Sequence, residues 1–322
     1  QSSTGLESMT AKDPSLDLQS QTDSPQWAIL SFRHRDWRNI KVYYVGQNNQ
    51  SVLYSKNVVI ELDKNDTIVD WENLSDVHIG NTNFQEELFE RRVKAILDDP
   101  YRFTSFGGDQ LDLILPGDPR FKDEAVGLGT LAEQQDEFDE RCAELFDEQD
   151  YYLKNYGMEK IWYMQWGNHE YKSRVVTEGD MKRYCKIKGL TFLGSKAFIR
   201  LDIQYKGKSM MKKTLFVNHG AGGGGTLKAL ENLTVNCEAD VYQMGHLHDP
   251  MGVKRDTFFY NDRKNSWDSK EQILVNSGCF TTAVSNNVDQ WMEQKGNKLQ
   301  TSKPGTWTIS FDAYNDKVSQ HG

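Results

Sequence analysis

Five of the seven histidines in this sequence follow a short apolar run and lie close to a glycine, an aspartate or an asparagine. They are His78, His169, His219, His246 and His248. A neutral imidazole binds divalent cations, and the same ring exchanges a proton near neutral pH. Carboxylate and amide oxygens bind hard cations. These residue types therefore indicate metal binding and proton transfer at the ends of several core strands.

The densest of these positions is Gly167-Asn168-His169-Glu170, which follows the apolar run from Ile161 to Trp166. The glycine permits a sharp turn. The amide oxygen of Asn168 suits a cation, and His169 suits proton transfer. Taken alone, the motif is equally typical of a polar turn that caps a strand. The other motifs along the chain favour a functional site.

Two pairs of polar residues share the same spacing. Asp76 and His78 close one extended segment, and His246 and His248 close another. Residues at i and i+2 of a strand point to the same side, so each pair can present two ligands to one point. A single D-x-H is common by chance, so it indicates a site only together with the other motifs.

Two further strand ends carry the same chemistry. Gly108-Asp109 closes one strand, and Asp112 is interpreted either as a neighbour of a ligand or as a helix cap. His219 closes another strand and precedes the glycine-rich run 220–225. That run can hold a phosphate through backbone N–H groups. It lacks the Gly-Lys-[Ser/Thr] ending of a nucleotide-binding P-loop, so we expect a mobile loop over the site.

In α/β folds, ligands bind at the carboxyl ends of strands. Five strand ends would bring together eight side chains, namely Asp76, His78, Asp109, Asn168, His169, His219, His246 and His248. Charged groups at such density repel one another unless a cation balances them. Oxygen and nitrogen ligands without thiolate suit Mn²⁺, Fe or Zn²⁺. The ligands outnumber the needs of one octahedral ion, so two ions are the better inference.

The ordered set D-x-H (76–78), G-D-x-x-D (108–112), G-N-H-E (167–170), His219 and G-H-x-H (245–248) resembles the calcineurin-like metallophosphoesterase superfamily. It is similar to the SbcD-type nucleases of DNA repair and to phage-encoded relatives. The resemblance covers residues 75–250 directly. It implies an α/β fold, a four-layer α-β-β-α sandwich with a binuclear metal centre.

The resemblance also implies a role for each matching residue. One metal would be held by Asp76, His78, Asp109 and His248, and the second by the bridging Asp109 with Asn168, His219 and His246. His169 would be the acid that protonates the leaving oxygen, with Asp112 and Glu170 supporting the ligands. The cofactor would be two divalent ions, Mn²⁺ first, with Zn²⁺, Fe and Mg²⁺ as alternatives.

The implied activity is phosphoester hydrolysis by a metal-bound hydroxide. Leu113-Ile114 stand where Ser/Thr protein phosphatases continue with Arg-Gly, and Asp112 stands where purple acid phosphatases carry Tyr. We therefore expect a phosphodiesterase, specifically a DNA nuclease. A phosphomonoesterase for a small molecule or phosphoprotein is the alternative enzyme. A scaffold that keeps the fold without the chemistry is the third hypothesis.

The sequence also predicts the helices and strands that position these residues. A helix is expected after Asn83 as N-cap, ending before Pro100, and a long acidic helix from Thr130 to Tyr156. Residues 1–25 have almost nothing to bury and are expected to be a disordered tail. Residues 26–70 form a β-rich extension, either an accessory module or the edge of the main sheet, and 71–322 form the catalytic domain.

Composition sets the remaining bounds. The 322 residues have a mean hydropathy of −0.71, and no apolar run is long enough for a membrane helix. Four scattered cysteines without a C-x-x-C pair favour a reducing, cytoplasmic setting. The segment 172–213 carries a local charge of +9 in a chain of net charge −9, which fits a DNA backbone or a lysine-guarded β-ribbon. A homodimer is expected from the family, although no segment shows how it would form.

Overall fold

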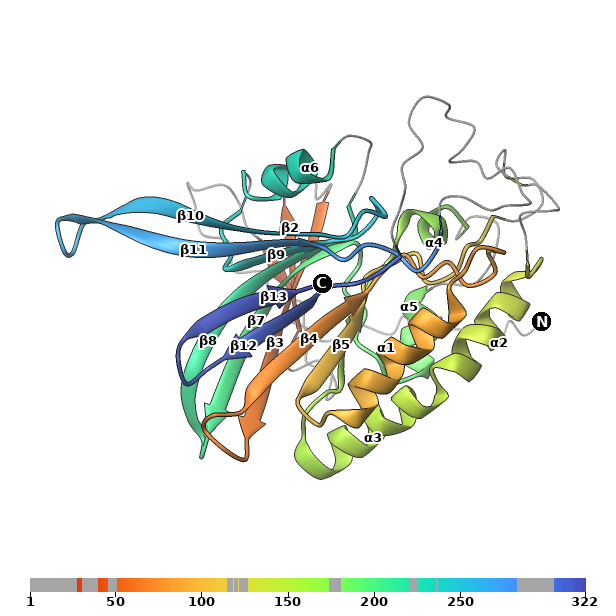
Figure 1. The fold of residues 1–322 in the computed structure, drawn as a ribbon, viewed down its shortest axis with the longest axis horizontal. Coiled ribbons are helices and arrows are strands. Elements are labelled where there is room, and N and C mark those ends of the chain that lie inside the picture. Colours follow the sequence, from red (N-terminus) through yellow and green to blue (C-terminus); the bar gives the residue numbers. More distant parts are fainter. Residues whose placement is uncertain are drawn as a thin grey trace, which may run out of the picture.

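The fold is an α/β architecture built on two mixed β-sheets, seen in a computed structural model (Figure 1). The structure describes residues 28–30, 40–45, 51–114, 118, 121, 127–173, 181–220, 225–235, 237–282 and 304–322. The expected tail 1–25, His34 and most of the glycine-rich run lie outside these residues. Among the described residues, no helix is long and apolar enough to cross a membrane.

One sheet has eight strands in the order β1-β2-β3-β7-β8-β9-β11-β10, and the other has five in the order β13-β12-β4-β5-β6. The strands of the first are β1 (Ala28–Leu30), β2 (Ile40–Val45), β3 (Ser51–Leu62), β7 (Lys196–Tyr205), β8 (Lys208–Asn218), β9 (Val241–Met244), β10 (Met251–Asn261) and β11 (Ser266–Asn276). The strands of the second are β4 (Ile68–Leu74), β5 (Arg102–Phe106), β6 (Ile161–Met164), β12 (Thr308–Asp312) and β13 (Lys317–His321). β3 pairs with β7, so the β-rich region before residue 70 extends the main sheet.

The main core lies between the two sheets. Along β7, buried and more exposed residues alternate, and Ala197, Ile199, Leu201 and Ile203 all point into this core. Alternation with a period of two is the geometry of a strand with one buried face. The indole rings of Trp71 on β4 and Trp162 on β6 stack there with centroids 5.3 Å apart.

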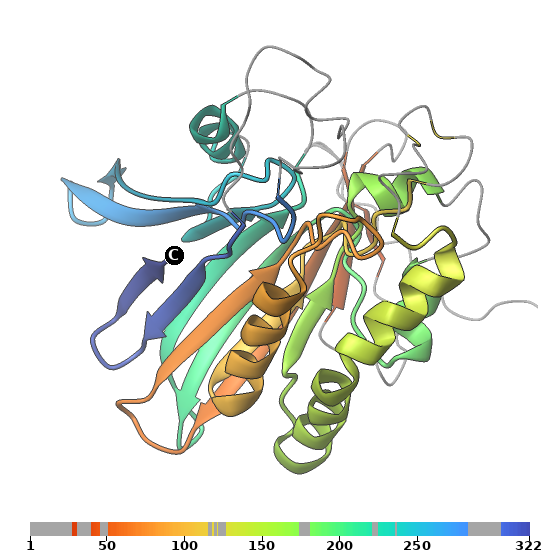
Figure 2. The same cartoon turned by 45° about the vertical axis from the view of Figure 1, so that its right-hand side comes forward.

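Helices cover both outer faces of the pair of sheets. A second apolar cluster joins the five-stranded sheet to α1 (Glu86–Asp98), α2 (Leu131–Arg141), α3 (Ala143–Tyr156) and α5 (Met181–Ile187). A third joins the eight-stranded sheet to α6 (Thr226–Leu233) through Leu230. The layers in space are therefore helix, sheet, sheet and helix (Figures 1 and 2), which confirms the expected four-layer arrangement.

Two helix predictions need correction. The helix after Asn83 begins at Glu86 with Gln85 as N-cap, because the Asn83 side chain donates to Thr282 O instead. The expected helix 130–156 is two helices, α2 and α3, separated at Cys142. Thr130 caps α2 in a capping box, as the sequence suggests.

The strand directions bring the functional loops to one edge. β4, β5 and β6 run parallel, and so do β8, β9 and β11. The carboxyl ends of all six therefore meet at the top of the sandwich in Figure 1, beside the short helix α4 (Asn168–Ser173). At the opposite side of the fold, β10 and β11 extend as a long hairpin that carries the exposed rings of Phe258, Tyr260 and Trp267.

Candidate metal centre

All eight side chains expected at the strand ends come from loops at this one edge. Asp76 and His78 follow β4, Asp109 follows β5, and Asn168 and His169 begin α4 after β6. His219 follows β8, while His246 and His248 follow β9. The ligand atoms of these residues form two converging Asp/His groups, and a third group that shares His78 with the first.

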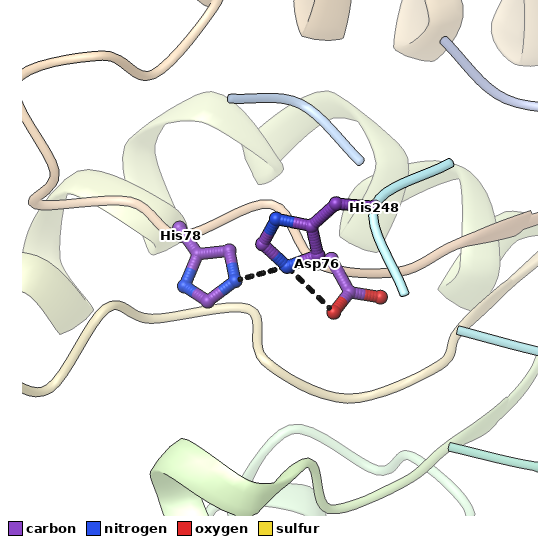
Figure 3. Close-up of side chains that lie close together, drawn as sticks. All are labelled: Asp76, His78 and His248. Atoms are coloured by element: carbon purple, nitrogen blue, oxygen red, sulfur yellow. Dashed lines mark hydrogen bonds and ion pairs between the residues drawn. The ribbon is translucent and has the colours of Figure 1, made fainter. Parts of the chain in front are cut away.

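The first group contains Asp76, His78 and His248, whose ligand atoms all lie within 4.8 Å of one another (Figure 3). His248 Nε2 lies 3.2 Å from His78 Nε2 and 3.2 Å from Asp76 Oδ1. Asp76 Oδ1 is buried and makes no hydrogen bond, although this ion-pair distance is short. Three electron-pair donors this close to one another fit a shared cation.

The second group contains Asp109, His219 and His246. His219 Nε2 lies 3.2 Å from Asp109 Oδ2 and 3.4 Å from Asn168 Oδ1. His219 Nδ1 lies 2.9 Å from the carbonyl oxygen of Gly107, so it donates there and leaves Nε2 as the ligand atom. Both groups offer one carboxylate and two imidazoles, which suits a first-row divalent ion.

Five of these ligand residues have an unusual backbone. Asp76, His78, Asp109 and His248 have φ of 54°, 55°, 53° and 45°, in the left-handed region that most L-residues avoid. His246 has φ of 72°. Such strain clusters where the surrounding structure imposes a geometry for function. Here it turns each side chain inward immediately after its strand ends.

Glycines allow the loops to approach one another. A Cβ on Gly167 would lie 1.9 Å from Asp109 Oδ1, and one on Gly245 would lie 2.1 Å from Ser75 Oγ and 2.5 Å from Asp76 Oδ2. A Cβ on Gly108 would lie 2.4 Å from the backbone of Gly167. The glycines in the three motifs are therefore packing requirements of the centre.

The electrostatics of the centre favour a cation. Burial alone would lower the pKa of His219, but the carboxylates of Asp109 and Asp76 outweigh it and raise that pKa to about 10. Burial likewise opposes ionisation of Asp76, but His219 and His248 lower its pKa to about 2. Protons and cations compete for the same ligand atoms. The field that holds a proton on His219 would also attract a divalent ion.

His169 lies at the edge of both groups and has its own contacts. Its ring stands edge-on to His78, with centroids 4.7 Å apart, and its Nδ1 contacts the carbonyl oxygen of Asp112. The carboxylate of Asp112 lies 3.1 Å from His78 Nδ1 and accepts from Asn81 Nδ2 at 3.3 Å. Asp112 therefore orients the ligand His78 through its side chain and His169 through its backbone.

Glu170 forms hydrogen bonds with the backbone of the loops that carry the ligands. Its buried carboxylate accepts hydrogen bonds from the backbone N–H groups of Asp109, Gln110 and Gly167 at 2.9, 2.6 and 2.9 Å. Burial and the nearby Asp109 carboxylate raise the pKa of Glu170 to about 7. These contacts fit the supporting role that the resemblance implies for Glu170.

Ser75 at the centre was missed in the sequence. Ser75 Oγ donates to Asp76 Oδ2 at 2.5 Å, and the backbone N–H of His246 donates to the same oxygen at 2.8 Å. Cys279 is buried with Sγ 3.7 Å from His248 O. The sequence signal for Ser75 was its place immediately before the D-x-H pair, where its hydroxyl group can reach the aspartate. Cys279 was expected at a turn beneath the site, with a structural role favoured over that of a nucleophile.

No protein-family model and no curated protein matches this chain. Among solved structures, a single mutant of Vps29 from Entamoeba histolytica is similar at 11% identity and a TM-score of 0.33, over 79% of this chain and 98% of that one. The calcineurin-like phosphoesterase YfkN from Bacillus subtilis is similar at 11% identity and a TM-score of 0.29, over 65% and 90%. A conserved uncharacterized protein from Streptococcus pneumoniae, described as a predicted phosphoesterase, is similar at 11% and 0.30, over 76% and 84%. These are similarities of fold, and the ligand geometry above does not depend on them.

Proposed function

We propose that this protein is a phosphoester hydrolase that uses two divalent metal ions, with a phosphodiester, specifically DNA, as its substrate. The observation that carries the proposal is the pair of converging Asp/His groups at one strand edge, with a further buried histidine, His169, beside them. Mn²⁺ is the first candidate ion, ahead of Zn²⁺, Fe and Mg²⁺, because the ligands are carboxylate oxygens and imidazole nitrogens.

Two bound cations would acidify a water and neutralise the charge of a phosphoryl group. The chain's own residues do the rest. The first group and the second group would each hold one of the ions, and glycine contacts fix the loops that carry these ligands. His169 contacts the Asp112 carbonyl oxygen through Nδ1, so Nδ1 carries the proton there. Nε2 is then the atom that exchanges a proton with the leaving oxygen.

The nuclease assignment is supported by the similarity of the motif order to SbcD-type enzymes and by the basic segment 172–213. Lys172 follows Asn168 by one helical turn, whereas Lys206 and Lys208 lie at the β7–β8 turn. His219 N bonds to Ser195 O, so the centre lies at the opposite end of β7 and β8 from that turn. A strand of this length spans roughly 35 Å at about 3.3 Å per residue. Only an extended polyanion can contact both ends.

The first experiment compares the hydrolysis of an aryl phosphodiester and the matching monoester in the presence of Mn²⁺. We expect a clear preference for the diester that is abolished by a chelator and by His169→Ala. A preference for the monoester would replace the nuclease assignment with a phosphatase. Bound metal without turnover of either ester would favour the scaffold hypothesis, and failure to bind metal would refute the metal centre itself.

The DNA assignment has its own test. Substitution of Lys206→Glu together with Lys208→Glu should weaken DNA cleavage and flatten its salt dependence, because fewer phosphates are neutralised. Hydrolysis of the small aryl diester should not change, because the turn is far from the centre. Unchanged DNA cleavage would remove this turn from the DNA path. A cytoplasmic location and a homodimer belong to the same proposal, and fractionation and light scattering test them.

A further inference from the structure

The short helix α4 carries an exposed aromatic side chain beside the candidate metal centre. Tyr171 is 49% exposed and lies three residues after Asn168, whose amide oxygen lies 3.4 Å from His219 Nε2. Helix residues three apart are neighbours on one side of the helix, with Cβ atoms about 5–6 Å apart. The backbone N–H of Tyr171 donates to Gly167 O at 3.2 Å, which fixes this turn. The Tyr171 side chain therefore starts from the side of α4 that carries Asn168.

A row of aromatic rings holds Tyr171 at that place. Its ring stands edge-on to that of Trp166, with centroids 5.7 Å apart. Trp166 is fixed in turn, because its backbone N–H donates to Gly194 O at 3.0 Å and its ring centroid lies 5.2 Å from that of the buried Phe192. Trp166 directly precedes the glycine before α4, so its contact keeps the Tyr171 ring over the N-terminal end of that helix. The candidate ligand and the candidate proton donor of α4 come from the same end.

The position of Tyr171 distinguishes it from the other exposed aromatic side chains in the described part of the chain. These are Tyr151 and Tyr156 on α3, Phe258, Phe259 and Tyr260 on β10, Trp267 on β11, and Tyr314 after β12. None of those elements carries a candidate ligand. A single exposed ring needs no explanation by itself. Tyr171, however, is exposed at the centre, and Lys172 beside it is exposed as well. Aromatic rings next to positive charge are typical of surfaces that bind single-stranded nucleic acid.

The contact with Trp166 leaves the Tyr171 ring able to stack. The two ring planes make an angle of 66°, so Trp166 covers at most one face of the Tyr171 ring. A planar base can stack on the other face, and such stacking accepts any base because every base has a π-face. In an intact duplex each base is covered on both faces by its neighbours. The ring therefore selects an unpaired nucleotide.

We propose that Tyr171 stacks on an unpaired base next to the phosphate at the candidate metal centre, so that the substrate is DNA with an unpaired strand. The ring starts one helical turn from Asn168, so the base it binds belongs to the nucleotide that adjoins that phosphate. Lys172 neutralises a neighbouring phosphate. This inference rests on the DNA part of the proposed function, and it adds which form of DNA is cut and which side chain selects it.

The test compares two fluorescently labelled oligonucleotides in the presence of Mn²⁺, one with bases and one abasic, of the same length. Both carry phosphorothioate linkages, which keep the charge and resist hydrolysis, and fluorescence anisotropy measures the affinities. We expect the wild type to bind the strand with bases about 5- to 150-fold more tightly, the effect of one stacked base. Tyr171→Ala should bring this ratio close to one, whereas Tyr171→Phe, which keeps the ring, should retain it.

Tyr151→Ala is the matched control. Tyr151 is also 49% exposed and also stands edge-on to neighbouring rings, those of Tyr152 and Tyr156, but it lies on α3. This variant should keep the wild-type ratio. Cleavage gives a second readout, because the wild type should cut a duplex with an unpaired tail faster than a blunt duplex, and Tyr171→Ala should lower that preference. Circular dichroism verifies that each variant is folded.

The outcomes separate the two proposals. Equal binding of the two oligonucleotides by the wild type overturns the stacking role. A wild-type ratio in Tyr171→Ala overturns it as well, because the ring then only packs against Trp166. Loss of the ratio in Tyr171→Phe would assign the effect to the hydroxyl group and overturn stacking equally. Wild-type protein that binds Mn²⁺ but neither oligonucleotide would instead refute the DNA part of the proposed function.

Discussion

At the scale of single residues, the hydrogen bonds behind the ligands matter as much as the ligands. Asp112 lies 3.1 Å from His78 Nδ1 and thereby sets which nitrogen of that ring faces the first group. Asp112→Asn should therefore weaken metal binding by the first group about 10- to 100-fold, because the amide supports the imidazole less well. Calorimetric titration with Mn²⁺ measures this. An unchanged affinity would mean that the Asp112 side chain does not orient His78.

The glycine between β6 and α4 is a second point of sensitivity. In Gly167→Ala the new methyl group would overlap Asp109 Oδ1 and Asp109 N, at 1.9 and 2.3 Å. We expect loss of the second cation and a lower melting temperature, because backbone and ligand must both move. Gly129→Ala is the control, since a Cβ there meets nothing within 4 Å. Wild-type metal binding by Gly167→Ala would show that the loops can separate.

At the scale of elements, the site motifs could be predicted because each follows a buried strand and has a fixed spacing. Asp76 and His78 follow β4 as expected, but they lie beyond its last residue with a left-handed backbone, so the i, i+2 rule of an extended strand is not what brings them together. The break between α2 and α3 could not be seen, because Cys142 is a plausible helix residue and only its backbone, with φ −103° and ψ 5°, leaves the helix. β10 was missed because none of its residues is buried, so its sequence lacks the apolar alternation that marks a strand with one buried face.

The start of β6 offers a test of stability against pH. Lys160 is fully buried, donates to Asp99 O at 2.7 Å and lies 4.9 Å from the ring centroid of Tyr152. Burial lowers its pKa to about 8 from the usual 10.5. Between those two pH values the unfolded chain binds more protons, so the free energy of unfolding should rise with pH, by at most about 1.4 kcal/mol per pH unit.

The control for this prediction is Lys160→Met, which removes the titrating amine and keeps the stem. The difference in unfolding free energy between the two proteins, measured by urea denaturation from pH 7.5 to 10, should change in favour of the lysine as pH rises. The comparison cancels contributions from Lys56, whose pKa is also lowered by burial. A pH-independent difference would contradict the shift at Lys160.

At the scale of the whole molecule, the candidate metal centre joins loops from the two sheets. His78 and His248 lie 170 residues apart in sequence, and their Nε2 atoms are 3.2 Å apart. A cation bound between such ligands binds only the folded chain. Mn²⁺ at 100 times its Kd should therefore stabilise the protein by about 2.7 kcal/mol per site, and a chelator should reverse this. Asp109→Asn should lose most of the effect in thermal unfolding.

The left-handed backbone at the ligands has a consequence for how the chain could change. At Asp76, His78, Asp109 and His248 the preferred residue for the backbone alone is glycine, which adopts positive φ at no steric cost. The metal-free His248→Gly protein should therefore be more stable than metal-free His248→Ala, by roughly 1 kcal/mol. Stability and metal binding thus make opposite demands on the same four positions. Selection for a more stable fold alone would replace the ligand residues at these positions first.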